Sequence, residues 1–190
     1  YSQPLDKIEK HLFKNHTIAA FVMESGAQLA GGVNIYQNNF QSQVSKICKR
    51  HNVLFILDEI ATGFGRLGSM VEYKTQKSSP DIVAFGKMLT AGYLPMAATL
   101  VTKKIYDSFL STYHDMKHLH HGHTFTGNTL ACAVASQNLD MYQKTNLISK
   151  ANKTAKHIEK RLEEFRKIKP KKPDEKEREM KRALRGRARG

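Results

Sequence analysis

The chain alternates short, strongly apolar runs with longer stretches in which apolar residues recur every three or four positions. The short runs predict strands at 18–23, 53–57, 81–85 and 96–102. The longer amphipathic stretches predict helices at 40–51, 103–110, 127–142 and 146–165. Strands that alternate with helices are typical of an α/β fold, in which a mostly parallel sheet has helices on both faces.

Polar residues follow three of the predicted strands. Glu24 follows the first, Asp58 the second, and Gly86 and Lys87 the third. In parallel α/β sheets, ligands bind beyond the carboxyl ends of the strands. We therefore expect a functional site at this edge of the sheet.

Lys87 and Asp58 suggest pyridoxal phosphate (PLP) chemistry. Lys87 stands among small and apolar residues, and a lysine removed from water can act as a nucleophile or form a Schiff base. PLP needs such a lysine, and it needs a carboxylate that keeps its pyridine nitrogen protonated. An acid at a strand end, such as Asp58 or Glu59, often only caps a turn, so this alternative stays open.

Two further patterns are weaker. Residues 63–68 (GFGRLG) match the dinucleotide-binding pattern, but five residues separate them from the preceding strand, so a flexible glycine loop is favoured. Five histidines lie between positions 114 and 123 without zinc-type Cys/His spacing. A polar loop is therefore favoured there, and no metal site is expected.

Taken together, the motifs resemble those of class III (fold type I) PLP-dependent aminotransferases. The resemblance runs from about residue 5 to about residue 165 and depends on the order and spacing of four segments: 21–32 (FVMESGAQLAGG), 57–68 (LDEIATGFGRLG), 85–100 (FGKMLTAGYLPMAATL) and 121–133 (HGHTFTGNTLACA). It implies that residues 1–165 form part of the PLP-binding large domain of this fold.

The resemblance also implies roles for the residues at the strand ends. Lys87 matches the Schiff-base lysine, which also moves the proton during transamination. Asp58 matches the partner of the pyridine nitrogen, and Ile60 matches the apolar residue under the ring. Glu24 matches an acid that pairs with a substrate-binding arginine.

A second group of implied roles lies in the segment 121–133. Gly122 matches a position that lines the substrate site. His123 and Thr124 match a pair that reaches the PLP phosphate of the neighbouring subunit. The resemblance therefore implies a homodimer with shared active sites.

Within the class, the DEIATGFGR, GYLPMAATL and HGHTFTGN segments most resemble the branch that aminates 8-amino-7-oxononanoate in biotin synthesis. The product would be 7,8-diaminononanoate, with S-adenosylmethionine or lysine as the amino donor. Another class III omega-aminotransferase is the alternative. The phosphate-binding cup and the carboxylate-binding arginine of the family are not found in this chain, so we expect it to be a fragment that is inactive alone.

The net charge of +14 is concentrated near the end of the chain. Residues 151–190 contain 16 basic and 7 acidic residues, a net charge of +9. The resemblance ends in the same region, so residues 166–190 are expected to be a disordered or aberrant tail. A nucleic-acid-binding module is the alternative from another class, but no binding motif accompanies the charge.

The remaining sequence features concern the compartment. No apolar run reaches 18 residues, no secretory leader is visible, and Cys48 and Cys132 do not form a disulfide framework. A cytoplasmic protein without membrane contact is expected.

Overall fold

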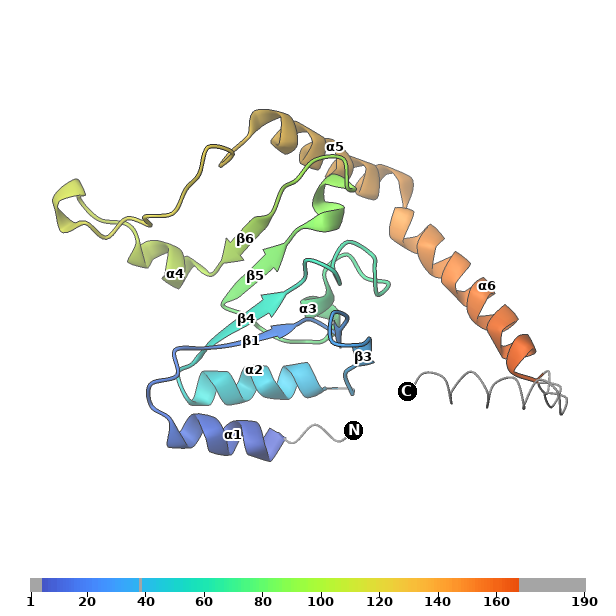
Figure 1. Ribbon diagram of the computed structural model, residues 1–190, viewed down its shortest axis with the longest axis horizontal. Helices are drawn as coiled ribbons and strands as arrows, with labels where there is room; N and C mark the ends of the chain where they lie inside the picture. The colour runs from blue at the N-terminus through green and yellow to red at the C-terminus, as the bar shows by residue number, and fades with distance from the viewer. Residues whose placement is uncertain (1–4, 38, 168–190) are drawn as a thin grey trace, which may run out of the picture. The chain divides into compact units, whose positions relative to one another are not determined.

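The computed structural model describes residues 5–37 and 39–167. Its centre is a four-stranded sheet in the order β1 (Ala20–Glu24), β4 (Leu54–Asp58), β5 (Ile82–Phe85) and β6 (Ala98–Val101) (Figure 1). The first three strands are parallel, and β6 is antiparallel to β5. The mostly parallel sheet of the predicted α/β fold is confirmed.

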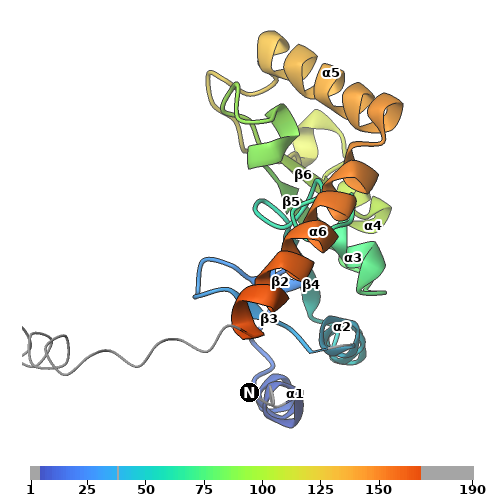
Figure 2. The ribbon, with the colours of Figure 1, turned by 90° about the vertical axis from the view of Figure 1, so that its right-hand side faces the viewer.

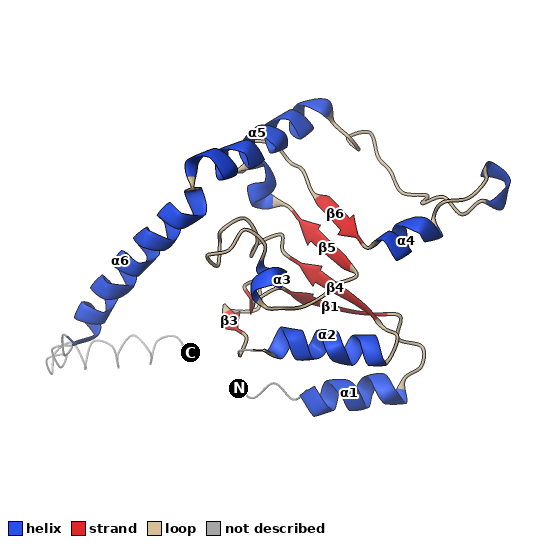
Figure 3. Ribbon diagram, turned by 180° about the vertical axis from the view of Figure 1, so that it is seen from behind, coloured by secondary structure: helices blue, strands red, loops and turns tan. Residues whose placement is uncertain are grey.

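Helices and a small hairpin make up the other described elements (Figure 3). They are α1 (Leu5–Lys14), α2 (Phe40–Arg50), α3 (Glu72–Thr75), α4 (Lys103–Ser108), α5 (Thr129–Thr145) and α6 (Leu147–Lys167), with 3-10 turns η1 (Lys87–Thr90) and η2 (Tyr113–Asp115), and the antiparallel pair β2 (Ala27–Gln28) and β3 (Asn34–Ile35). Every predicted strand and helix is present within a few residues. The elements α3, η1, η2, β2 and β3 were not predicted, because they are too short to show a periodicity. Helix α1 is long enough and was also not predicted.

The chain divides into two compact units, residues 1–152 and 153–190. The second unit is described only as far as Lys167, where it continues helix α6. The predicted boundary near residue 165 therefore stays a prediction, and most of the predicted tail lies outside the described residues. No helix in the described ranges is long and apolar enough to cross a membrane.

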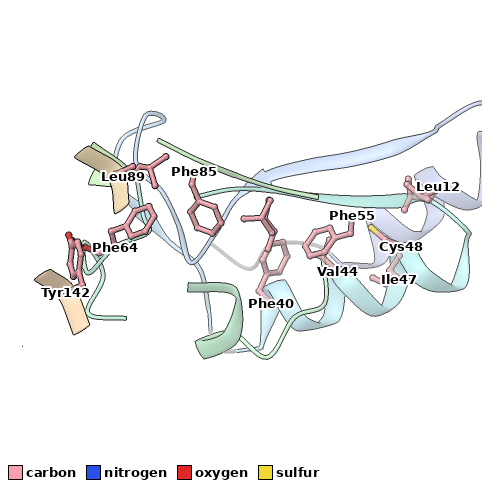
Figure 4. Close-up of a cluster of buried hydrophobic side chains, with 14 residues drawn as sticks. Leu12, Phe40, Val44, Ile47, Cys48, Phe55, Phe64, Phe85, Leu89 and Tyr142 are labelled. Atoms are coloured by element: carbon pink, nitrogen blue, oxygen red, sulfur yellow. Dashed lines mark hydrogen bonds between the residues drawn. The ribbon is translucent and has the colours of Figure 1, made fainter. Parts of the chain in front are cut away.

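The hydrophobic core lies on one face of the sheet. Phe55 and Leu57 of β4 are fully buried, and the register places Phe21 and Met23 of β1 beside them. Helix α2 covers this face with the residues that its periodicity predicted, Val44, Ile47 and Cys48 (Figure 4). Helix α1 packs against α2, as Figure 2 shows.

Side chains on a strand alternate between the two faces of a sheet. Val22 and Ile56 therefore lie on the face opposite the core, and Val22 is 63% exposed. Glu24 and Asp58 belong to the same alternating set. The strand register thus turns both carboxylates away from the hydrophobic core.

The core continues past the end of β5 to helix α5. Phe64, Phe85 and Tyr142 form adjoining ring contacts, and the Tyr142 hydroxyl donates a 2.9 Å hydrogen bond to the Phe64 carbonyl. Phe64 belongs to the GFGRLG loop, so α5 holds the loop that follows β4. This packing favours the glycine-loop interpretation of the motif, because a Cβ at Gly63 would lie only 2.9 Å from the Glu59 carbonyl oxygen.

Candidate functional site

The carboxyl ends of three strands lie at the same edge of the sheet. The register pairs Glu24 with Asp58 and Asp58 with Ala84. Lys87 follows β5 after a single glycine. The strand order β1, β4, β5 therefore brings the three predicted positions to adjacent strand ends, as parallel topology requires.

Asp58 and Glu59 are neighbours in sequence but differ in environment. Asp58 is half-buried, and its Oδ1 accepts a 2.8 Å hydrogen bond from the Ile60 backbone N–H. This is the local turn expected of an acid at a strand end. It uses one carboxylate oxygen, and among the described residues the other oxygen accepts no hydrogen bond.

Glu59 has a structural role instead. Its side chain is fully buried, and its two oxygens accept hydrogen bonds from the backbone N–H groups of Glu72 (2.8 Å) and Tyr73 (2.6 Å) at the start of α3. Burial raises the pKa of Glu59, while hydrogen bonds from the two N–H groups and from Ser25 act in the opposite direction. The two adjacent acids thus differ in their bonding: both oxygens of Glu59 bind the start of α3, whereas one oxygen of Asp58 accepts no hydrogen bond from the described residues.

A buried glutamine, which was not among the predicted site residues, supports the same edge of the sheet. The Oε1 of Gln41, on helix α2, accepts a 2.8 Å hydrogen bond from the Gly26 N–H, just after β1. Its Nε2 donates to Ser25 at 3.0 Å and to Ser78 at 2.8 Å. Gln41 falls on the buried side of α2, next to Phe40, and a polar residue among apolar positions is the only signal that marked it.

Lys87 lies at the start of the turn η1 and is exposed. The expectation of a desolvated lysine, drawn from its apolar neighbours, is wrong for the described residues. Phe85 and Leu89 are buried, but the burial of residues that are near in sequence does not extend to the Lys87 side chain. The ammonium group is therefore accessible to a ligand.

Ile60 connects the ends of β4 and β5. A Cβ placed on Gly86 would lie 3.2 Å from Cγ2 of Ile60, so the isoleucine packs closely over the glycine that precedes Lys87. An uncommitted carboxylate oxygen, an apolar side chain and an accessible amine thus follow two adjacent strands. These groups fit the needs of PLP, which uses an acid for its ring nitrogen and an amine for its aldehyde.

Glu24 is half-buried, and its Oε2 accepts a 2.9 Å hydrogen bond from the Leu29 N–H. This bond joins the end of β1 to the loop between β2 and β3. Burial raises the pKa of Tyr36, and the nearby Glu24 carboxylate adds to this shift. Within the described ranges, Glu24 forms no ion pair with an arginine.

The predicted residues of the second group lie in a different environment. Gly122, His123 and Thr124 are all exposed. Their loop is held by short-range bonds, in which the His123 N–H donates to Thr126 Oγ1 at 2.9 Å and the Phe125 N–H donates to His123 Nδ1 at 3.1 Å. No hydrogen bond between described residues joins this loop to Asp58, Ile60 or Lys87.

A hollow of about 630 Å³ lies between this loop and the segment before β6. Its lining includes Pro95, Met96, His123 and Asn128. Upstream in the same loop, the rings of His118 and His120 are in contact in a tilted arrangement, with 3.9 Å between their centroids. Among the described residues no cluster of three His, Cys, Asp or Glu side chains has the arrangement of a metal site.

Comparison with known proteins supports the resemblance. Residues 1–175 match the aminotransferase class-III family. The chain is 44% identical over 159 residues to the adenosylmethionine-8-amino-7-oxononanoate aminotransferase of Staphylococcus aureus, covering 83% of this chain and 35% of that protein. It is 40% identical over 165 residues to the protein of the same name from Aquifex aeolicus, covering 87% of this chain and 36% of that one.

The structural comparison agrees. The crystal structure of the protein of that name from Methanocaldococcus jannaschii has a TM-score of 0.80 and 38% sequence identity, over 88% of this chain and 40% of the other. The chain spans little more than a third of the length of the relatives it matches. The ordered motifs, the sheet and these matches together show that the chain belongs to the class III aminotransferase family.

Proposed function

We propose that this chain provides part of the active site of a PLP-dependent aminotransferase that converts 8-amino-7-oxononanoate to 7,8-diaminononanoate in biotin synthesis. The observation that carries the proposal is the placement of Asp58, Ile60 and Lys87 after two adjacent strands, packed through Gly86. Relatives that bear the corresponding name, at 38–44% identity, support the choice of substrate.

PLP, when bound, links to amino groups and accepts the electrons released at the substrate carbon. Lys87 Nζ would hold its aldehyde until the amino group of the donor takes that place, and the lysine amine released by this exchange would then move a proton between the donor Cα and the cofactor C4′. The free oxygen of Asp58 would hold the proton on the ring nitrogen, since a carboxylate favours the charged form of a nearby base. Ile60 would cover the ring face and exclude water from it.

The other predicted residues complete this proposal. Glu24 would orient a substrate-binding arginine, and Gly122 would line the substrate site. His123 and Thr124 would contact the cofactor phosphate of a neighbouring subunit in a homodimer. S-adenosylmethionine or lysine would be the amino donor, and a cytoplasmic location accords with such an enzyme.

The proposal extends to the organisation of the protein. Residues 1–165 would form part of the PLP-binding large domain, and residues 166–190, most of which lie outside the described residues, would be a basic tail. Because the chain spans little more than a third of its relatives, we expect negligible transamination from these 190 residues alone.

The experiment is to incubate the protein with PLP, reduce with borohydride, and locate the attached pyridoxyl group by peptide mass. Attachment is expected at Lys87 and is expected to disappear in Lys87→Ala. Lys77→Ala is the matched control, because Lys77 is also exposed and also has a positive φ, 50° against 40° for Lys87. Attachment spread evenly over the lysines, or retained at that level in Lys87→Ala, would overturn the proposal.

The substrate is tested separately. In a protein extended to the length of the relatives, 8-amino-7-oxononanoate should accept an amino group from S-adenosylmethionine or from lysine, measured as formation of 7,8-diaminononanoate. Transfer only to other carbonyl acceptors would favour a different class III omega-aminotransferase.

A further inference from the structure

The turn that carries Lys87 has an unfavourable backbone conformation. Lys87 has φ of +40°, in a region that residues with a Cβ rarely adopt. This angle sets the direction in which the lysine leaves the end of β5. A conformation of this kind persists only where surrounding contacts hold it.

Hydrogen bonds within the turn define its local shape. The Leu89 N–H donates to the Gly86 carbonyl at 2.9 Å, and the Gly92 N–H donates to the Lys87 carbonyl at 3.3 Å. Thr90, which is 1% exposed, donates from its hydroxyl to the Leu94 carbonyl at 2.6 Å. These bonds join residues of one short segment, so they do not determine where the segment lies relative to the rest of the fold.

A link to a distant element is made by Asn138 of α5. Its Nδ2 donates to the Met88 carbonyl at 2.7 Å and to the Leu89 carbonyl at 3.1 Å. One side-chain amide thus holds the two carbonyl groups that directly follow Lys87, from fifty residues further along the chain. Helix α5 lies beside this turn, the light green segment after β5 (Figure 1).

The same helix holds the loop after the neighbouring strand. Tyr142 lies four residues after Asn138, and so on the same side of α5, and binds the Phe64 carbonyl in the loop that follows β4. Helix α5 therefore fixes the segments that follow both strands of the candidate site. Asparagine is a poor residue for a helix interior, and at position 138 its amide is used for these two bonds to the turn.

We propose that Asn138 is a positioning residue, which sets the turn so that Lys87 is aimed at the cofactor. It acts through the carbonyl groups of Met88 and Leu89 and does not contact reacting atoms. The inference rests on the proposed function of Lys87. It gives helix α5 a role in positioning a lysine that lies about fifty residues earlier in the chain.

The test compares Asn138→Ala and Asn138→Asp with the wild type. Alanine removes both donors, and aspartate keeps the shape but replaces the donors with a carboxylate that faces two carbonyl oxygens. Gln137→Ala is the matched control, because Gln137 is exposed and adjacent on the same helix. Asn138→Ser keeps a smaller donor and guards against loss of the fold in the harsher variants.

The measured quantity is the fraction of Lys87 that holds PLP at equilibrium, trapped with borohydride, divided by the fraction of Lys77 that holds PLP in the same molecule. Each lost hydrogen bond changes an equilibrium severalfold, so the ratio should fall about tenfold in Asn138→Ala and Asn138→Asp. It should fall less in Asn138→Ser and stay unchanged in Gln137→Ala. The thermal midpoint of each variant is recorded beside it.

The outcomes separate the two proposals. An unchanged ratio in all three Asn138 variants, with the wild type labelled at Lys87, would overturn the positioning role and leave the proposed function intact. A ratio that stays constant while the thermal midpoint falls would show that Asn138 is merely structural, which also overturns it. No preference for Lys87 in the wild type would overturn the proposed function itself.

Discussion

The two halves of the predicted site are built in different ways. At the strand ends, Asp58, Ile60 and Lys87 are fixed by the strand register, by packing through Gly86 and by a buried acid next to Asp58. In the loop between α4 and α5, residues 109–128, every side chain is exposed. Among the described residues, the hydrogen bonds of residues 111–126 join this loop only to itself, for example from Ser111 and Thr112 to Asp115.

This difference distinguishes site residues that one chain brings together from loop residues that its own fold leaves exposed. The strand ends converge because a parallel sheet brings them to one edge. The loop residues Gly122, His123 and Thr124 have no such scaffold within the described residues. An exposed loop that resembles a functional segment of its family is what a site shared with a neighbouring subunit requires, and it supports the homodimer proposal.

The largest expected difference between the two regions is in packing. Phe55→Ala, in β4, should lower the free energy of unfolding by about 3–5 kcal/mol, because this side chain is 1% exposed and its loss leaves a cavity. Phe125→Ala is the matched control in the loop, where the ring is 72% exposed, and a change within about 0.5 kcal/mol is expected. Urea unfolding measures both. Equal losses would remove the distinction between the regions.

Glu59→Gln tests the buried support behind the site. Glutamine has one acceptor oxygen for the two N–H groups of α3, so a loss of about 1–3 kcal/mol is expected at acidic pH. The pKa of Glu59 is raised, so its contribution to stability is full below the unfolded pKa near 4.5 and declines as the pH rises through the folded value.

The difference in unfolding free energy between the wild type and Glu59→Gln should therefore become smaller as the pH rises above about 4.5. Urea unfolding at several pH values measures this difference. A difference that grows with pH would mean that the α3 N–H groups stabilise the ionised carboxylate more than burial destabilises it.

Asn128→Ala tests the junction between the loop and α5. The Asn128 side chain accepts a 2.9 Å hydrogen bond from the Ala131 N–H and caps the helix. Its loss should cost about 1 kcal/mol of unfolding free energy, while Asn128→Ser, which can also cap, should cost only a few tenths. A loss in the serine variant as large as in alanine would show that the asparagine acts through something other than capping.

Thr124→Ala should have the smallest effect on stability. The side chain is exposed, so the free energy of unfolding should change by less than about 0.5 kcal/mol. Under the proposed function, the same variant should weaken PLP binding in the assembled homodimer, measured by titration with PLP. A large loss of stability would instead place Thr124 in the packing of its own chain.

Much of the fold could be predicted from the sequence because its elements depend on local periodicity. The alternation of apolar residues located the strands, and the spacing in α2 marked Val44, Ile47 and Cys48 as core. Helix α1 also buries a periodic residue, Leu12, and is the clearest omission of the prediction. The candidate site was predicted from the order of its motifs, which reflects the positions of strand ends along the chain.

The sequence by itself therefore determined the elements, the family and the polar positions that follow each strand. Only the tertiary structure decided what these positions do. Asp58 and Glu59 look alike in sequence, but the alternation of side chains sends one into the core and leaves the other open. Asn138 reaches the turn of Lys87 across fifty residues, a contact that packing creates and that local sequence does not encode.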